Sequence, residues 1–393
     1  MMLTNPKNYR VALLSLAVGG FGLGLTEFVI MGLLREVAQT TGVTIAQAGH
    51  YISAYALGVV VGAPVLTALA NKIKARTALI WLMGCFAVFN TLSAAAGSYA
   101  WLFLARFLAG LPHGAFFGIG AVVAKNLAPP GQSARAAATM FAGLTFANVL
   151  GVPVGTLIGQ KVGWQWTFVL IGVVGVLAMA AIYLLLPDVE TDSELNWSVL
   201  RRGSIWAVLA LTIIGTGGFF AWYSYIAPLV TEVSGLSDQW VTVATVLAGV
   251  GMTAGNVLGA KLADRYSPLA AASALLLLLS AALFTFSRIA VHPVATLAFI
   301  LLIGALSFSI VAPIQLAMIQ AAEGAETMGS AINQSAFNMG NALGAYLGGL
   351  PVAMGLGVAS ANWVGSGLAC LGSLIAAALV LTAARKPTIP CSC

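Results

Sequence analysis

Apolar stretches of 20 to 28 residues recur along the whole chain, and short polar segments that carry most of the charge separate them. A helix crosses the hydrocarbon core of a bilayer with about 20 apolar residues, at a rise of about 1.5 Å each. None of the stretches alternates in the manner of a barrel strand, so the pattern predicts an all-α membrane protein with twelve spans. The predicted spans are residues 11–33, 45–70, 77–96, 101–124, 134–160, 165–186, 204–231, 239–262, 269–290, 293–318, 325–350 and 359–383.

The composition supports a membrane protein. Of the 393 residues, 60% are hydrophobic and 7% are charged, and the mean hydropathy is +0.99, whereas soluble domains carry about 25% charged residues. The first stretch, 11–33, is too long for a signal-peptide core and lacks a convincing cleavage site, so we expect a retained span. The lipid bilayer is therefore the first partner that the sequence predicts.

The net charge of +6 would suit nucleic-acid binding, but the basic residues lie in short loops without interleaved aromatics, so no nucleic-acid partner is expected. Thirteen of the 17 Lys and Arg residues share one side of the membrane with both termini, and Arg35, Lys161 and Arg288 lie on the other. The positive-inside rule then places both termini in the cytoplasm. The thirteen are Lys7, Arg10, Lys72, Lys74, Arg76, Lys125, Arg135, Arg201, Arg202, Lys261, Arg265, Arg385 and Lys386.

Chemistry other than transport finds little support. The chain has no intramembrane Ser/His/Asp group, no His-rich metal cluster and no nucleotide-binding loop, so we expect no enzyme, metal or cofactor. Two of the four cysteines, Cys85 and Cys370, fall inside spans, and Cys391 and Cys393 end the chain, so no disulfide framework is predicted.

The chain divides into two similar halves. The longest polar break predicts a cytoplasmic linker at 187–203 between an N-terminal six-helix bundle, 1–186, and a C-terminal one, 204–393. Glycine patterns repeat between equivalent spans, Gly62 with Gly255 and the trio of Gly151, Gly155 and Gly159 with Gly340, Gly344 and Gly348, at offsets near 190 residues. Two pseudo-symmetric bundles are the architecture of a rocking transporter with its site between them.

Glu27 and Arg106 are predicted to share a membrane depth. Glu27 lies about six residues from the end of the first span and Arg106 about five from the start of the fourth, on the same side. Because buried charges in lipid need partners, we expect an ion pair. It is either a static bridge that fixes helix packing or a site where Glu27 exchanges Arg106 for a proton.

His113 lies near mid-membrane in the fourth span, directly after Pro112. Its imidazole either bonds a carbonyl that the proline kink leaves open, or serves as a proton relay or a solute ligand. Glu27, Arg106 and His113 are the candidate proton-coupling residues.

The C-terminal half offers neutral polar groups. Gln334, Asn338 and Asn341 form one stripe at i, i+4 and i+7 of the eleventh span, and Gln315 lies in the tenth. Trp222 and Tyr225 add aromatic edges; together these groups suit a polyhydroxylated or amphipathic solute. The alternatives are hydrogen bonds between helices for the amides and an interfacial belt for the aromatics. The candidate solute-binding residues are His113, Phe117, Asn148, Trp222, Tyr225, Gln315, Gln334 and Asn338.

The chain resembles the major facilitator superfamily over essentially its whole length, and within it the arabinose-efflux permease (AraJ-like) subgroup. The motifs that carry the resemblance are Thr26-Glu27-Phe28-Val-Ile-Met-Gly32, Ala48-Gly49-His50, Tyr55-Ala-Leu-Gly-Val-Val-Val-Gly-Ala-Pro64, Gly110-Leu-Pro-His-Gly-Ala-Phe-Phe-Gly118, Ala147-Asn148-Val-Leu-Gly-Val-Pro-Val-Gly-Thr156, Phe220-Ala-Trp-Tyr-Ser-Tyr225, Arg265-Tyr-Ser-Pro268 and Ala336-Phe-Asn-Met-Gly340. The resemblance implies proton-driven efflux of sugars, sugar analogues or hydrophobic drugs across a bacterial inner membrane.

The resemblance also implies a cytoplasmic gate, formed here by Asn71, Lys72, Asp264 and Arg265. The chain departs from the family pattern at Asn71, where an acidic residue is usual, and at Gly151-Val-Pro153, where Pro usually follows Gly directly. We expect a monomeric, proton-coupled antiporter for a small molecule; a passive facilitator and a non-transporting solute receptor are the alternatives.

Overall fold

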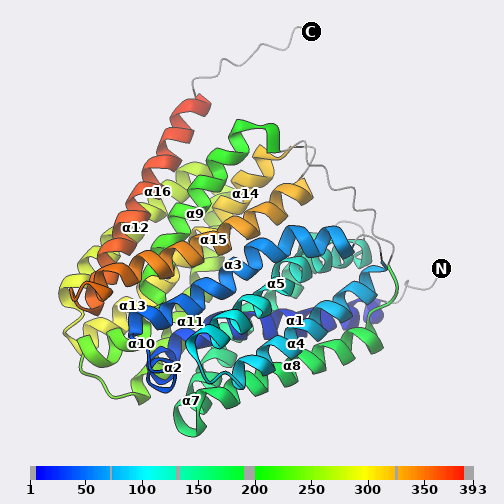
Figure 1. Cartoon of the computed structure of the whole chain (residues 1–393). Coiled ribbons are helices and arrows are strands. Elements are labelled where there is room, and N and C mark those ends of the chain that lie inside the picture. Colours follow the sequence, from blue (N-terminus) through cyan, green and yellow to red (C-terminus); the bar gives the residue numbers. More distant parts are fainter. Residues whose placement is uncertain (1–5, 71–72, 130–132, 190–199, 324–325, 385–393) are drawn as a thin grey trace.

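The computed structural model describes residues 6–70, 73–129, 133–189, 200–323 and 326–384 (Figure 1). Over these ranges the secondary structure is helical and contains no strand, as the apolar pattern predicts. The helices form two six-helix bundles. The predicted linker, 187–203, falls mostly on residues outside the described ranges, so the boundaries between the two bundles stay a prediction.

The first bundle, here the N-terminal bundle, contains eight named helices and one π-helical turn. These are α1 (Pro6–Gly32), α2 (Leu34–Thr41), α3 (Ile45–Ala70), α4 (Ala75–Ala94), α5 (Tyr99–Leu127), α6 (Ser133–Phe146), η1 (Ala147–Gly151), α7 (Val152–Val162) and α8 (Trp164–Leu185). The short α2 follows the first span, and α6, η1 and α7 together make the fifth.

The second bundle, here the C-terminal bundle, has the same order of spans. Its elements are α9 (Gly203–Tyr223), α10 (Ile226–Pro228), η3 (Leu229–Val233), α11 (Gln239–Arg265), α12 (Pro268–Ile289), α13 (Pro293–Ser309), α14 (Val311–Ala321), α15 (Glu326–Ala353), η4 (Val358–Ser360) and α16 (Ala361–Ala384). Helices α13 and α14 form one span.

Eleven segments in the described part of the chain are long and apolar enough to cross a membrane. The predicted span outside this set is α15, whose 28 residues are ample in length. Its buried or half-buried amides, Asn333, Gln334, Asn338 and Asn341, lower its hydropathy. With α15 the chain has its twelve spans, and the least apolar of them carries the polar stripe.

Close helix packing at glycines repeats between the bundles. A Cβ on Gly62 of α3 would collide with the main chain of Leu111 in α5, and one on Gly255 of α11 would collide with that of Ala305 in α13. The second and fourth spans of each bundle therefore meet through backbone contact, which small residues permit in membranes. The expected pseudo-symmetry thus has a physical basis in equivalent close contacts.

Pro153 shapes the fifth span. A proline lacks an amide hydrogen, and its ring displaces the carbonyl four residues earlier, here that of Val149. The helix accommodates this with the π-helical turn at Ala147–Gly151, which carries Asn148.

The two bundles contact each other near the end opposite the start of α1 and the end of α16 (Figure 1). We call this end, with segments 33–44, 224–238 and 354–360, the distal end. There Ser53 Oγ of α3 donates to the Ala342 carbonyl of α15 at 2.9 Å. A Cβ added to Gly49 of α3 or to Gly349 of α15 would collide with the hydroxyl of Tyr225. The distal end is therefore closed by helix-to-helix contact.

Candidate functional site

Arg106 is fully buried inside the N-terminal bundle and is held by Thr26. Its Nη1 donates to Thr26 Oγ1 at 2.8 Å, and its Nη2 donates to the Thr26 carbonyl at 2.9 Å. Thr26 Oγ1 donates in turn to Asn90 Oδ1 at 2.5 Å. The guanidinium carbon lies 4.4 Å from the ring centre of Tyr55 and 5.3 Å from that of Phe168. Oxygen acceptors and aromatic faces thus surround this cation.

The predicted ion pair between Glu27 and Arg106 is wrong. Over the described residues no ion pair joins them, because Arg106 is directed to Thr26. Successive residues on a helix point about 100° apart, so a guanidinium that binds Thr26 is turned away from the next side chain. The depth prediction agrees with the structure, since Arg106 reaches the residue directly before Glu27.

Glu27 contacts the other bundle instead. Its carboxyl is buried, with 3% of the residue exposed, and Oε1 accepts a hydrogen bond from Asn341 Nδ2 of α15 at 3.2 Å. The neighbouring Phe28 stacks on Phe220 of α9, with 6.4 Å between ring centres, and meets Tyr223 edge-on at 6.0 Å. Helix α1 therefore presents a carboxyl and a ring to the C-terminal bundle at one level.

His113 is bonded to a neighbouring helix. Its Nδ1 lies 2.8 Å from the hydroxyl of Tyr55 on α3, so its partner is a phenol and not a carbonyl freed by Pro112. The same Tyr55 ring lies under Arg106. His113 also contacts Phe117, with ring centres 5.2 Å apart. Arg106, Tyr55 and His113 thus form one continuous line of polar and aromatic groups.

Among the predicted amides of the C-terminal bundle, Gln315 is bonded to a neighbouring helix, and the nitrogen of Asn338 is bonded within its own helix. Gln315 Oε1 accepts from Asn333 Nδ2 at 2.6 Å, and Asn333 Oδ1 accepts from the Thr212 hydroxyl at 2.8 Å. Asn338 Nδ2 donates to the main-chain carbonyl of Gln334 at 3.0 Å. These bonds agree with the alternative of hydrogen bonds within the bundle for Gln315.

Three predicted residues, Asn338 among them, keep a polar atom without a partner among the described residues. They are buried, and the atoms are Asn148 Oδ1, Asn338 Oδ1 and Trp222 Nε1. Leaving a buried polar atom without a partner costs free energy, so a solute that supplies the missing hydrogen bond gains binding free energy. Of the predicted solute-binding set, these three have the clearest free bonding capacity.

Burial excludes the interfacial belt for both predicted aromatics. Trp222 and Tyr225 are fully buried. The Tyr225 hydroxyl donates to the Ala345 carbonyl at 2.9 Å, which places this residue in the closed distal contact. Trp222 packs on Phe219 and Tyr223 instead.

The predicted cytoplasmic gate is described only in part. Asn71 and Lys72 lie outside the described residues, as does the side chain of Asp264, although its backbone is in α11. Arg265 is exposed, and its guanidinium lies 5.7 Å from the ring centre of Tyr266. The gating role of these four residues stays a prediction.

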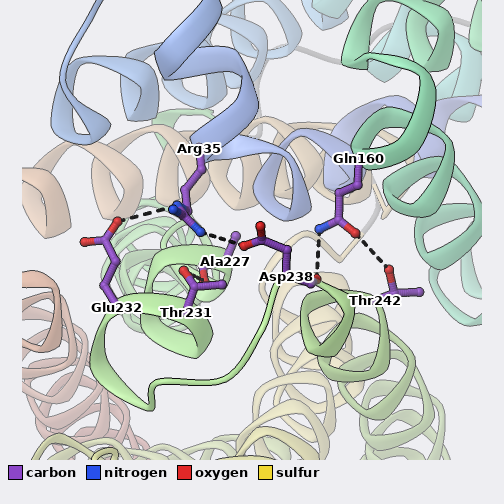
Figure 2. Close-up of polar contacts among 7 residues, drawn as sticks. All are labelled: Arg35, Gln160, Ala227, Thr231, Glu232, Asp238 and Thr242. Carbon is purple, nitrogen blue, oxygen red and sulfur yellow. Dashed lines mark hydrogen bonds and ion pairs between the residues drawn. The ribbon is translucent and has the colours of Figure 1, made fainter.

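A polar cluster that the sequence did not predict joins the bundles at the distal end (Figure 2). Arg35 Nη1 of α2 lies 2.6 Å from Asp238 Oδ1, and Arg35 Nε lies 3.7 Å from Glu232 Oε1. Gln160 Nε2 of α7 donates to the Asp238 carbonyl at 3.2 Å and its Oε1 accepts from Thr242 at 3.4 Å. We call these five residues the distal latch. In the sequence Arg35 was only one of three basic residues on the less basic side.

The comparisons of this chain with known proteins agree with one another. Residues 16–333 match the family described as Major Facilitator Superfamily. The chain is 39% identical to AraJ of Escherichia coli strain K12 over 351 residues, 88% of this chain and 89% of AraJ. It is 40% identical to the inner membrane transport protein YdhP of that strain over 383 residues, covering 96% and 97%. A chloramphenicol resistance protein of Streptomyces lividans is 31% identical over 371 residues, covering 92% and 94%.

Solved structures share the fold. A D-xylose–proton symporter superposes with a TM-score of 0.78 at 14% identity, covering 94% of this chain and 97% of that one. A bacterial homologue of the human lysosomal transporter Spinster gives 0.73 at 16% identity, covering 98% of both chains. At such low identity these likenesses establish the fold alone.

Proposed function

The chain belongs to the Major Facilitator Superfamily, and from that premise we propose that this membrane transporter is a proton-coupled antiporter. It exports a small sugar-like or amphipathic solute by alternating access, as a monomer in a bacterial inner membrane with both termini in the cytoplasm. The relative named as a chloramphenicol resistance protein supports export of a drug-like solute, and the relative named as an inner membrane transport protein supports the location.

The observation that carries proton coupling is the position of Glu27. A carboxylate in the interior of a membrane protein is costly unless it is bonded or protonated. Glu27 lies at a contact between the bundles, where its bond comes from Asn341 of the other bundle. Opening the distal end would remove that bond and admit water, so the carboxyl would gain access to protons in one state and lose it in the other.

The proposed solute site is compatible with transport by alternating access. Asn148, Asn338 and Trp222 have unpartnered polar atoms and come from both bundles, and His113 and Phe117 are further candidates on α5. A solute bonded to residues of both bundles stabilises the state in which they approach, which is how a ligand shifts a conformational equilibrium.

Transport by the purified protein in proteoliposomes tests the proposal. We expect an imposed pH gradient to drive accumulation of labelled arabinose or chloramphenicol, and Glu27→Gln to abolish this while solute counterflow persists. Glu323→Gln, an exposed carboxyl just after α14, is the matched control and should retain the gradient-driven transport. Undiminished gradient-driven transport by Glu27→Gln would refute the role of Glu27, and wild-type transport that ignores the gradient would favour a passive facilitator.

A further inference from the structure

We propose that a pocket at the distal end binds an amphipathic organic cation, and that the bound cation holds this end closed. The pocket, here the distal pocket, has a volume of about 670 Å³, which is in the range of binding sites for small molecules. None of the residues proposed above for solute binding or proton coupling lines it. Binding there goes beyond the proposed function, because it requires the closed distal end and no proton coupling.

Both bundles form the distal pocket. Its lining residues come from the start of α3 in the N-terminal bundle, and from η3, α15 and the segment that leads into η4 in the C-terminal bundle. Gly349, one of these residues, also lies against the hydroxyl of Tyr225 in the contact that closes the distal end. Thr44, Gln47 and Gly355 are exposed, so the pocket is open to solvent while the bundles stay in contact.

Glu232 gives the distal pocket a negative charge. Among the lining residues, all of which the structure describes, it is the only Asp, Glu, Lys or Arg, and its side chain is 40% exposed. Its contact with Arg35 is long, with 3.7 Å between Oε1 and Nε, whereas Arg35 Nη1 lies 2.6 Å from Asp238. Figure 2 shows the second carboxylate oxygen of Glu232 directed away from Arg35. Since one arginine faces two carboxylates, one negative charge is left for a cationic ligand.

Two aromatic rings, one from each bundle, also line the pocket. The ring centres of His50 on α3 and Tyr346 on α15 are 5.9 Å apart. Tyr346 is 48% exposed, and the face of a tyrosine ring attracts an ammonium group. His50 Nδ1 is bonded to the hydroxyl of Tyr99 at 2.8 Å, and its Nε2 has no partner among the described residues. A carboxylate and two aromatic rings in one pocket are groups that recognise an organic ammonium ion.

Apolar side chains favour an amphipathic cation over a simple ion. Val233, Leu350 and Val358 line the same pocket, and only a ligand with an apolar body removes their surface from water. In the described part of the chain, no group of His, Cys, Asp and Glu residues could hold a metal ion. The start of α3 offers little to an anion, because the amides of Thr44 and Gln47 are already bonded.

A ligand in the distal pocket stabilises the closed distal end. It contacts α3 on one side and α15 and η3 on the other, and these walls separate when the end opens. A ligand that binds one state better shifts the equilibrium toward that state. An amphipathic amine added on the distal side therefore slows transport without occupying the solute site.

Three ligands that share one apolar body test the chemistry of the pocket. They are 4-phenylbutylamine, which is cationic at neutral pH, the neutral 4-phenylbutanol and the anionic 4-phenylbutyrate. Equilibrium dialysis against the full-length protein in lipid nanodiscs measures binding, and protein-free nanodiscs correct for partition into lipid. We expect saturable binding of the amine, about fivefold tighter than that of the alcohol, and no binding of the acid. Equal binding of amine and alcohol, or no saturable binding of the amine, would overturn the proposal.

Substitutions in the pocket locate the bound amine. Glu232→Gln should raise the Kd of the amine by about fivefold and leave that of the alcohol unchanged. Tyr346→Leu, which keeps an apolar side chain, should raise the Kd of the amine by about two- to fivefold. Glu323→Gln removes the same charge from an exposed residue just after α14, and it is the matched control that should leave the Kd unchanged. Amine binding that neither pocket substitution weakens would place the site elsewhere and refute the proposal.

Nitroxide labels test the effect on closure. They are attached to cysteines that replace Thr40 and Val294, two exposed residues of different bundles that do not line the pocket, and the native cysteines are replaced by serine. At ten times its Kd, the amine should raise the ratio of closed to open distal ends by up to about tenfold, and by about threefold in Glu232→Gln at the same concentration. An unchanged ratio in the wild type would disprove the closing effect.

These measurements are independent of proton coupling. If the amine does not bind, the distal pocket is not a cation site and the proposed antiport is unaffected. If transport ignores a pH gradient, the antiport fails, while binding and closure by the amine still decide the role of the distal pocket.

Discussion

Arg106 grips Thr26 with both terminal nitrogens, one on the hydroxyl and one on the carbonyl, at 2.8 and 2.9 Å. These two hydrogen bonds fix the rotation of α1 about its axis at the level of Glu27. Because Thr26 is turned into the N-terminal bundle, the next residue, Glu27, is turned toward Asn341. The buried cation therefore acts on the carboxyl mainly by orienting the helix that carries it.

Arg106→Lys should destabilise the protein although it keeps the charge. Lysine cannot reach both Thr26 oxygens in a fixed fork, so at least one hydrogen bond to a charged group is lost. We expect a loss of about 1.5–3 kcal/mol in unfolding free energy, measured by chemical denaturation in detergent.

The control for this prediction is Arg288→Lys, because Arg288 is exposed and lies over the ring of Phe284. It should change stability by no more than about 0.5 kcal/mol. Equal losses of unfolding free energy in the two variants would contradict a special role for the hydrogen bonds between Arg106 and Thr26.

Reversing the charge of Arg35 should weaken the distal latch. Arg35 and Asp238 are 30% and 64% exposed, so solvent screens the pair and its loss should cost about 1 kcal/mol or less. Arg35→Asp should therefore lower the ratio of closed to open distal ends by up to about fivefold, as measured from the distance between nitroxide labels on cysteines that replace the exposed residues Thr40 and Met354. Adding Asp238→Arg should restore part of the closure, and raised salt should reduce the wild-type closure. No recovery in the double variant would argue against direct pairing.

Asn338→Ala should weaken solute binding. The substitution removes the unpartnered Oδ1 acceptor, and one such bond is worth about 1 kcal/mol, or roughly a fivefold rise in Kd. The shift in melting temperature that arabinose or chloramphenicol produces measures this, since a ligand bound to the folded state stabilises it.

A suitable control for Asn338→Ala is Asn362→Ala on α16, another buried amide, which the proposed site does not include. It should lower stability without changing the ligand-induced shift. An unchanged shift in Asn338→Ala would remove this residue from the solute site.

Asp188 should make stability depend on pH at the end that carries the termini. Lys74 Nζ donates to its Oδ2 at 2.9 Å, and this hydrogen bond lowers the pKa of the carboxyl, with the charge of Arg76 adding to it. A lowered carboxyl pKa means that the bond stabilises the fold above the ordinary pKa of Asp, and that this is lost as pH falls through the lowered value.

Asp188→Asn should therefore melt below the wild type at neutral pH and coincide with it in strong acid, as measured by thermal unfolding across pH. Lys74→Met should behave in the same way. A difference between Asp188→Asn and the wild type that persists in acid would show that the carboxylate charge is not responsible.

The sequence by itself determined the spans, their number and the duplication. A helix in lipid satisfies its own backbone groups, so length and apolarity suffice to find it without knowledge of its neighbours. The glycines at Gly62 and Gly255 were informative for the same reason, since close backbone approach depends on the local absence of a side chain. The amides of α15, which are visible in the sequence, also explain why its hydropathy is lower than that of the other spans.

Only the tertiary structure decided which polar groups meet. Counting residues along the spans correctly placed Arg106 at the depth of Glu27. In the structure, however, α1 is rotated so that Arg106 bonds to Thr26, the preceding residue. Glu27 then met Asn341, which the sequence placed in a polar stripe with no assigned partner. Depth follows from a count along one helix, whereas partnership depends on the rotation of two helices and on the approach of two bundles, and no local pattern specifies these.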